Sequence, residues 1–132
     1  MTLSQSKRKP RIYNSYRGWK NIGEKKYYFK SKWEFKYATL LQKLKDSGYI
    51  LEWVYEPQIF YFDAIKRGTR SFTPDFKITL SDGRHYWVEV KGYMDAKSQT
   101  KIKRFKKYYP KEEIHIVDSK YFSKSKLVHK HE

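Results

Sequence analysis

Three residues in the segment 70–93 have the types and spacing to hold a divalent cation. Asp75 follows a proline, and Glu89 stands two residues before Lys91, on the far side of an Asp82-Gly83 turn signal. In a hairpin whose register sets Asp75 opposite Glu89, both carboxylates and the lysine fall on one face. Carboxylate oxygens are the ligands that Mg²⁺ prefers, and a lysine beside them adds a positive charge or acts as a base. The segment is therefore a candidate site for metal-assisted chemistry.

The pairing register decides whether those carboxylates meet. A two-residue loop pairs Asp75 with Val90 and mixes apolar and charged side chains on both faces. A three-residue loop, with Gly83 left-handed, pairs Asp75 with Glu89 and separates the faces cleanly. Because a slip by one residue reverses the faces, this separation predicts the three-residue loop. The apolar face is then Phe76, Ile78, Leu80, Tyr86, Val88 and Val90, and the other is Asp75, Lys77, Thr79, His85, Trp87, Glu89 and Lys91.

Two interpretations of the opposed carboxylates remain open. Like charges directly opposite each other in a sheet are destabilising. In a structural interpretation, Lys77, Lys91 or solvent on an exposed face relieves the repulsion. In a functional interpretation, a divalent cation lies between Asp75 and Glu89, removes the repulsion and supplies a Lewis acid.

The segment 31–46 is expected to form an amphipathic helix that ends at Gly48. Glu34 lies at the edge of its apolar stripe, which is about 100° wide and would face the core. Ser31 and Glu34 also have the spacing of a capping box, in which the glutamate reaches back to the N-cap amide. The pattern alone favours this capping role over a place in the site. The stripe consists of Trp33, Tyr37, Leu40, Leu41 and Leu44.

The other elements predict a small α/β domain. Residues 50–62 are expected to form one or two strands interrupted at Glu56-Pro57, and Glu56 is left open as a further residue of the same cleft. A second, basic helix is expected over 96–109, with Asp95 as its N-cap. Residues 113–118 alternate like a final strand. The order is helix, strands, helix and strand.

The composition indicates one domain with a polyanionic partner. Among 132 residues, 30 are Lys or Arg and 14 are Asp or Glu, and the formal net charge of +16 favours nucleic acid over a membrane surface. No stretch approaches the ~18 apolar residues of a spanning helix, and no signal-peptide pattern follows the start. The lack of cysteine excludes disulfides and thiolate metal sites, and fits a reducing, cytoplasmic location. A solvated tail is favoured over weak metal binding by His129 and His131.

Basic residues gather at both ends of the chain and on the second helix. Residues 1–26 are expected to be a flexible arm in which Tyr13, Tyr16 and Trp19 can stack on bases or sugars. The alternative is a disordered solubilising tail, but charge of this density is expected to need a partner. Residues 119–132 are expected to be a basic C-terminal tail. The candidate DNA-binding residues are Lys7, Arg8, Lys9, Arg11, Arg17, Lys97, Lys101, Lys103, Arg104 and Lys107.

The motifs of the chain resemble those of the PD-(D/E)XK nuclease superfamily. They are TPDF at 73–76 and VEVKG at 88–92, preceded by FKSKWEFKYA at 29–38, which resembles the family's first-helix glutamate motif. The similarity runs from about Phe29 to Asp118 and includes YEP at 55–57. Within the superfamily, the order and length are most similar to phage endonuclease I, the junction-resolving type. The transposon end-cleaving subunit is less similar because it normally carries a second domain.

The resemblance implies a fold, a reaction and a set of residue roles. The fold would be α/β, with a restriction-endonuclease-like core over 27–118 and a mixed central sheet flanked by helices. The reaction would be Mg²⁺-dependent hydrolysis of DNA phosphodiester bonds, with Mn²⁺ able to substitute. Lys91 would lie near the attacking water or the scissile phosphate. The implied metal ligands are Asp75, Glu89, the Val90 carbonyl and Glu34 (directly or through water), and the implied catalytic residues are Glu34, Asp75, Glu89 and Lys91.

The same resemblance implies branched DNA or four-way junctions as the substrate. Two cuts need two sites, so a homodimer is expected, with residues 55–62 as the segment that could bridge the subunits. A phage-encoded enzyme would act in the host cytoplasm. One alternative is a sequence-specific nicking, homing or transposition-type endonuclease of this superfamily. The other is a basic DNA-binding module without catalysis, in which Asp75 and Glu89 form structural pairs.

Overall fold

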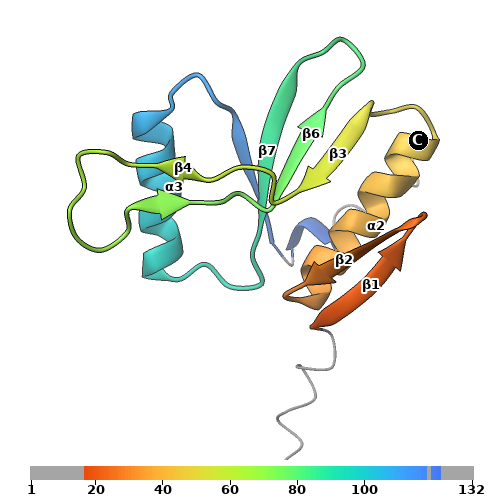
Figure 1. The fold of residues 1–132 in the computed structure, drawn as a ribbon, viewed down its shortest axis with the longest axis horizontal. Coiled ribbons are helices and arrows are strands. Elements are labelled where there is room, and N and C mark those ends of the chain that lie inside the picture. Colours follow the sequence, from red (N-terminus) through yellow and green to blue (C-terminus); the bar gives the residue numbers. More distant parts are fainter. Residues whose placement is uncertain (1–16, 119, 123–132) are drawn as a thin grey trace, which may run out of the picture.

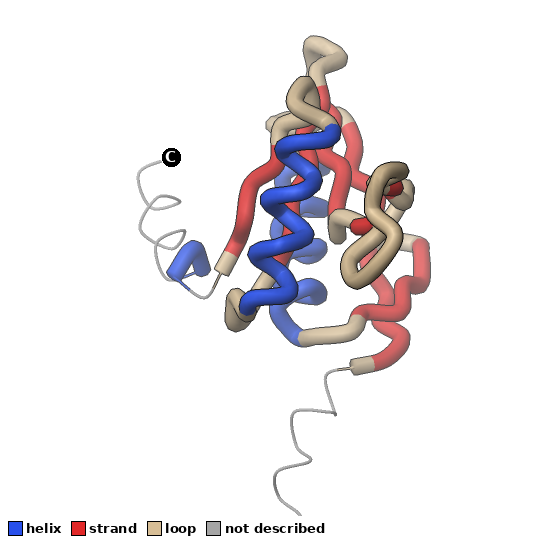
Figure 2. The backbone as a smooth tube through the Cα atoms, turned by 90° about the vertical axis from the view of Figure 1, so that its left-hand side faces the viewer, coloured by secondary structure: helices blue, strands red, loops and turns tan. Residues whose placement is uncertain are grey.

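The computed structural model describes residues 17–118 and 120–122, which form a mixed sheet with one helix on each face (Figure 1). The strand order is β3-β6-β7-β8, with β8 parallel to β7 and the other neighbours antiparallel. Helix α3 links β7 to β8 as the crossover that parallel neighbours require, and α2 lies behind it in Figure 2. The predicted α/β class with a mixed sheet is therefore confirmed. The bounds are α2 Lys32–Asp46, β3 Glu52–Tyr55, β6 Phe76–Thr79, β7 His85–Val90, α3 Ala96–Tyr108 and β8 Ile114–Val117.

Two short strand pairs flank this sheet. Strands β1 (Gly18–Ile22) and β2 (Lys25–Phe29) form a hairpin that contacts α2, and β4 (Phe60–Tyr61) pairs with β5 (Ser71–Phe72) near α3. The predicted interruption of the strand region is confirmed, because Glu56 has a φ of 47° and separates β3 from β4.

The β6–β7 hairpin has the predicted register. Phe76 pairs with Val88, and the ladder continues to a three-residue loop in which Gly83 has a φ of 93°. Only glycine adopts this left-handed conformation without steric cost. Asp75 and Glu89 follow the last ladder pair, so the same register sets them opposite each other.

The apolar face of the hairpin packs against α2, whose apolar stripe faces the core as expected. Tyr37 and Leu41 of α2 are buried in one cluster with Phe76 and Val88. The ring centroids of Tyr37 and Phe76 lie 5.3 Å apart. The buried stripe of α2 is rotated slightly from the expected one, since Ala38 is buried. The remaining members of the predicted stripe are only partly buried: Trp33, Leu40 and Leu44.

The other face of the hairpin carries a second apolar core. Trp87 on this face is 2% exposed, and its ring centroid lies 5.0 Å from that of Phe60 in β4. Phe105 of α3 is fully buried, and its ring centroid lies 4.8 Å from that of Phe60. The structural interpretation of Asp75 and Glu89 assumed that this face is exposed. That assumption is wrong, because α3 and the β4–β5 pair cover the face.

The expectation of a flexible arm over residues 1–26 is wrong for residues 17–26, the part of it that the structure describes. Residues 18–26 lie in the β1–β2 hairpin, and Ile22 and Phe29 are buried against α2. Dense charge hid the alternation of side chains, in which Lys20 shares the inward face with the apolar Ile22, Tyr27 and Phe29. The candidate contacts Lys7, Arg8, Lys9 and Arg11 lie outside the described residues, as do Tyr13 and Tyr16.

The described part of the C-terminal segment also packs on the core. Residues 120–122 form a helical turn. The ring centroids of Tyr121 and Phe122 lie 6.0 and 6.4 Å from that of Tyr37. His129 and His131 lie outside the described residues. Within the described ranges, no helix has the length and apolar character needed to cross a membrane.

Replacing Phe105 with alanine tests whether α3 and the second core stabilise the domain. We expect Phe105→Ala to lower the free energy of unfolding by about 3–5 kcal/mol, because it leaves a cavity beside Phe60 and Phe72. The exposed Lys106→Ala on the same helix should change it by less than about 0.5 kcal/mol. Urea denaturation measures both, and equal small effects would contradict the second core.

Candidate functional site

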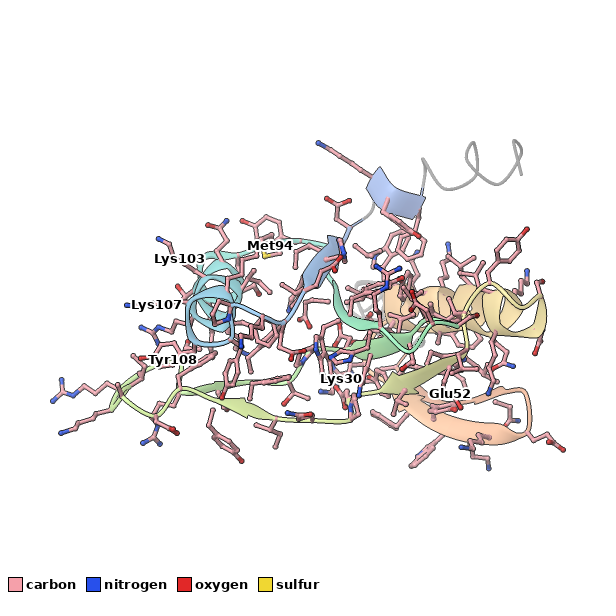
Figure 3. The ribbon with its side chains drawn as sticks, turned by 90° about the horizontal axis from the view of Figure 1, so that it is seen from above. Lys30, Glu52, Met94, Lys103, Lys107 and Tyr108 are labelled. Atoms are coloured by element: carbon pink, nitrogen blue, oxygen red, sulfur yellow. The ribbon has the colours of Figure 1, made fainter. Side chains whose placement is uncertain are left out.

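A polar pocket of about 290 Å³ lies where the ends of β6 and β7 meet the first turn of α2. The side chains around it are mostly charged, with four carboxylates and three lysines. Lys30 lies between the α2 half and the α3 half of the molecule in Figure 3. The charged residues that line the pocket are Glu34, Glu56, Asp75, Glu89, Lys30, Lys91 and Lys101.

Asp75 and Glu89 are tied together across the hairpin. The Oδ2 of Asp75 accepts a hydrogen bond from the Val90 amide at 2.8 Å, and the Oε1 of Glu89 accepts one from the Asp75 amide at 3.2 Å. Each residue is 6% exposed. The two carboxylates therefore have fixed positions and little water to solvate their charge.

Lys91 supplies the only ion pair within 4.0 Å of this carboxylate pair among the described residues. Its Nζ lies 3.3 Å from Glu89 Oε2, and its backbone amide donates to the Val117 carbonyl of β8 at 2.8 Å. Lys77 does not relieve the repulsion, because its Nζ lies 5.7 Å from the centre of the Trp87 ring. Lys77 therefore does not balance the two charges, which leaves one ion-paired lysine for two largely buried carboxylates.

Burial raises the pKa of both carboxyl groups. For Asp75, burial is the main cause, and the charges of Glu89 and Glu34 raise its pKa further, well above the usual range. The pKa of Glu89 is raised to about 7, mainly by burial and against the opposing effect of Lys91. The pair therefore holds a proton far more readily than two exposed carboxyls would.

Glu34 is fixed at the pocket by two hydrogen bonds to one oxygen. Its Oε1 accepts from the Lys30 amide at 2.8 Å and from the Tyr55 hydroxyl at 2.7 Å. Its own amide donates to the Ser31 hydroxyl at 3.1 Å, so Ser31 is the N-cap as predicted. The expected return bond to the N-cap amide is displaced by one residue, to Lys30. Glu34 thus combines a capping contact with a place in the pocket.

The sequence did not reveal Lys30, which lines the pocket, or Tyr55, whose hydroxyl binds Glu34 from outside the pocket lining. Lys30 Nζ pairs with Glu56 Oε2 at 2.9 Å, and this contact raises the Lys30 pKa. Burial and the bond to Glu34 raise the pKa of the Tyr55 hydroxyl strongly, so it remains a proton donor. The alternation of β3 and the YEP segment were visible in the sequence, but the contact with α2 depends on tertiary packing. Glu56, which the sequence left open, lines the same pocket.

Lys97 is exposed in the first turn of α3, and the other candidate DNA-binding residues of this helix divide into three groups. Lys101 lines the pocket. Arg104 donates a hydrogen bond to the Thr69 carbonyl, which ties α3 to the loop before β5. Lys103 and Lys107 project from the outer side of α3, away from the sheet (Figure 3). The exposed members of the set outside the pocket are Arg17, Lys97, Lys103 and Lys107.

The carboxylates fit a Mg²⁺ ion that also takes ligands from outside the chain. In the described ranges, no three Asp, Glu, His or Cys side chains form a ready-made metal cluster. However, the Oδ1 of Asp75 and the Oε2 of Glu34 accept no hydrogen bond there, and no polar side-chain atom of these ranges is both fully buried and unpaired. Solvent therefore reaches both oxygens. Mg²⁺ commonly uses one or two carboxylates, several waters and a substrate phosphate.

Comparison with known proteins gives a family without an assigned activity. A family model described as "Protein of unknown function (DUF1064)" matches residues 13–124. No curated protein and no solved structure matches the chain significantly. All seven charged residues of the pocket lie within the matched range.

Asp75→Asn should make the protein more stable at alkaline pH. Folding raises the pKa of both carboxyls of the pair, so the stability that they contribute is complete below their unfolded pKa values and is lost as the pH rises through the folded ones. For Glu89 this range runs from about 4.5 to about 7. The parent therefore carries an unfavourable charge above pH 7, which the neutral asparagine removes while it still accepts from the Val90 amide. We expect an increase of roughly 1–3 kcal/mol in the free energy of unfolding at pH 8, and a smaller one at pH 5.

Thermal and urea unfolding at both pH values measure this effect. Asp63→Asn is the matched control, because Asp63 is exposed on the loop after β4 and should change stability equally little at both pH values. A variant less stable than the parent at pH 8 would show that the ionised Asp75 stabilises the fold.

Proposed function

The chain belongs to the DUF1064 family of proteins of unknown function, and we propose that it is a Mg²⁺-dependent DNA endonuclease that acts on branched DNA. One observation carries this proposal: Asp75 and Glu89 are both buried in one pocket, and among the described residues only Lys91 forms an ion pair with either of them. An arrangement that costs stability at neutral pH is typical of a functional site.

The proposal includes a restriction-endonuclease-like core within the mixed α/β fold. It is supported by the order of the elements, in which α2 brings Glu34 to the end of a hairpin and α3 then crosses to a parallel strand. The Pro74-Asp75 and Glu89-Val90-Lys91 motifs lie at the same end of that hairpin.

Asp75, Glu89, Glu34 and the Val90 carbonyl would hold the metal. When bound, Mg²⁺ or Mn²⁺ would supply a Lewis acid for the phosphate and lower the pKa of a coordinated water. Val90 and Asp75 hold each other through the 2.8 Å bond between the Val90 amide and Asp75 Oδ2, which leaves Oδ1 free toward the pocket. Tyr55 and the Lys30 amide orient Glu34 in the same way, with Oε2 free.

Lys91 has a separate role on the substrate side of the pocket. Its side chain is 30% exposed, and its backbone is fixed to β8, so the ammonium group is held at the edge of the carboxylate pair. From there it can neutralise a phosphate oxygen or exchange a proton with the attacking water. Glu89 limits where the ammonium group can go, because the two groups lie 3.3 Å apart.

The charge distribution favours DNA as the substrate. The pocket has four carboxylates against three lysines and would repel a phosphate without a bound cation. Outside it, the net charge of +16 and the exposed lysines of α3 attract a phosphate backbone without reading its bases. Shape is then the remaining basis for selectivity, which favours a branched substrate over a sequence-specific one.

A homodimer with two equivalent sites is part of this proposal, since a four-way junction needs two cuts.

Cleavage and DNA binding should separate at the carboxylate pair. We expect Asp75→Asn to reduce Mg²⁺-dependent cleavage of a four-way junction by at least a hundredfold, because a metal ligand is lost. DNA affinity measured in Ca²⁺ should hold or rise, because a negative charge near the phosphate is removed. Lys91→Ala should also stop cleavage, with affinity unchanged or slightly weaker.

Lys77→Ala is the matched control for Lys91→Ala. Lys77 lies on the same face of the hairpin but outside the pocket, so its loss should leave cleavage within about threefold of the parent. Near-parental cutting by Asp75→Asn in Mg²⁺ would refute the assignment of the site. Parallel losses of folding and DNA binding in both variants would instead favour a DNA-binding module without catalysis.

The outer side of α3 should contribute to the salt dependence of DNA binding. Lys103 and Lys107 lie one turn apart and point away from the sheet (Figure 3). If both contact phosphates, Lys103→Ala with Lys107→Ala should lower the slope of log K against log salt by about 2. The control is Lys36→Ala with Lys43→Ala, two exposed lysines of α2. Equal slopes for the two double variants would remove α3 from the DNA footprint.

A further inference from the structure

The outer face of the β1–β2 hairpin presents two aromatic rings to solvent. Trp19 and Tyr28 are cross-strand partners, and they are 65% and 40% exposed. Their ring centroids lie 5.6 Å apart at an interplanar angle of 77°. An edge-to-face pair of this kind leaves ring faces uncovered. The opposite face of the hairpin is already used, because Ile22 and Phe29 are buried against α2.

Cations surround this aromatic pair and connect it to the pocket. Exposed Arg17 directly precedes β1, and exposed Lys26 lies two residues before Tyr28 on the same strand face. Lys30 directly follows β2, and its Nζ contacts Glu56 in the wall of the pocket. Tyr28 therefore lies two residues from Lys30, which lines the carboxylate site, and Trp19 is the cross-strand partner of Tyr28. A strand whose phosphate enters the pocket would pass close to them.

We propose that this surface, the pair Trp19–Tyr28 with Arg17, Lys26 and Lys30, stacks on an unpaired base beside the strand that enters the pocket. The substrate class is thus DNA with an unstacked nucleotide, as at a junction, a bulge or a gap. The location of the strand rests on the proposed nuclease function, whereas the stacking itself needs no cleavage.

Base stacking explains why such a surface distinguishes branched from intact DNA. Inside a duplex, neighbouring base pairs cover both faces of every base, so an aromatic side chain gains nothing from it. An unpaired base has a free π-face, and aromatic stacking on it is insensitive to sequence. The flanking cations bind the backbone of either DNA, so they supply affinity without this discrimination.

The test uses a short duplex with one unpaired 2-aminopurine, compared with the same duplex fully paired, in Ca²⁺ without cleavage. Stacking on an aromatic ring should quench the 2-aminopurine fluorescence, and the parent should bind the bulged duplex more tightly. Trp19→Ala and Tyr28→Ala should each weaken binding to the bulged duplex by about tenfold and relieve the quenching. Binding to the paired duplex should change less than twofold, and Trp19→Phe should restore most of both signals.

Tyr49→Ala is the matched control, because Tyr49 is 63% exposed after the C-terminal end of α2 and does not line the pocket. It should behave like the parent. Equal losses on both duplexes, or quenching that survives Trp19→Ala and Tyr28→Ala, would overturn the stacking proposal. So would a dimer in sedimentation that Trp19→Ala dissociates, because the face would then be covered by a second copy. Failure of the nuclease assignment leaves these readouts intact, since none depends on cutting.

Discussion

The register of the β6–β7 hairpin is the constraint on which the site and both cores depend. Side chains alternate along a strand, so a shift of one residue would exchange the two faces. Asp75 and Glu89 would then enter the apolar cluster, and Phe76 and Val88 would enter the polar pocket. The three-residue loop prevents this shift, because Gly83 takes a φ of 93° that other residues adopt only at a cost. Burial of Phe76, Ile78 and Val88 against α2 stabilises the same register.

The same register forces a conflict between stability and the chemistry of the pocket. It sets two carboxylates side by side at 6% exposure, where burial raises the pKa of both. Lys91 balances one charge at most, and Glu34 adds a third carboxylate that Tyr55 and the Lys30 amide hold in place. A divalent cation would remove this conflict by replacing the retained proton. The pocket thus stores an unfavourable interaction that a metal-bound state would relieve.

The sequence was sufficient for elements whose pattern is local. Clean separation of the hairpin faces predicted the register, and Ser31 and Asp95 predicted where the two helices begin. Prediction from the sequence failed where a contact joins segments that are far apart in the chain. The second core depends on Trp87 meeting Phe60 and Phe105, so that face was interpreted from its polar members alone. The β1–β2 hairpin was hidden because Lys20, Lys25 and Lys26 interrupt the apolar alternation of its strands. The role of Tyr55 appears only when β3 lies beside α2.

If Asp75 and Glu89 form a divalent-cation site, the protein should bind Mn²⁺ through them. The electron paramagnetic resonance signal of free Mn²⁺ can be followed during titration into the parent and Asp75→Asn at pH 6 and pH 8. Because protons compete for carboxyls with raised pKa values, the parent should bind Mn²⁺ more tightly at pH 8 than at pH 6. Asp75→Asn should lose this binding at both pH values. Equal Mn²⁺ binding by parent and variant, with no dependence on pH, would show that Asp75 and Glu89 are not a divalent-cation site.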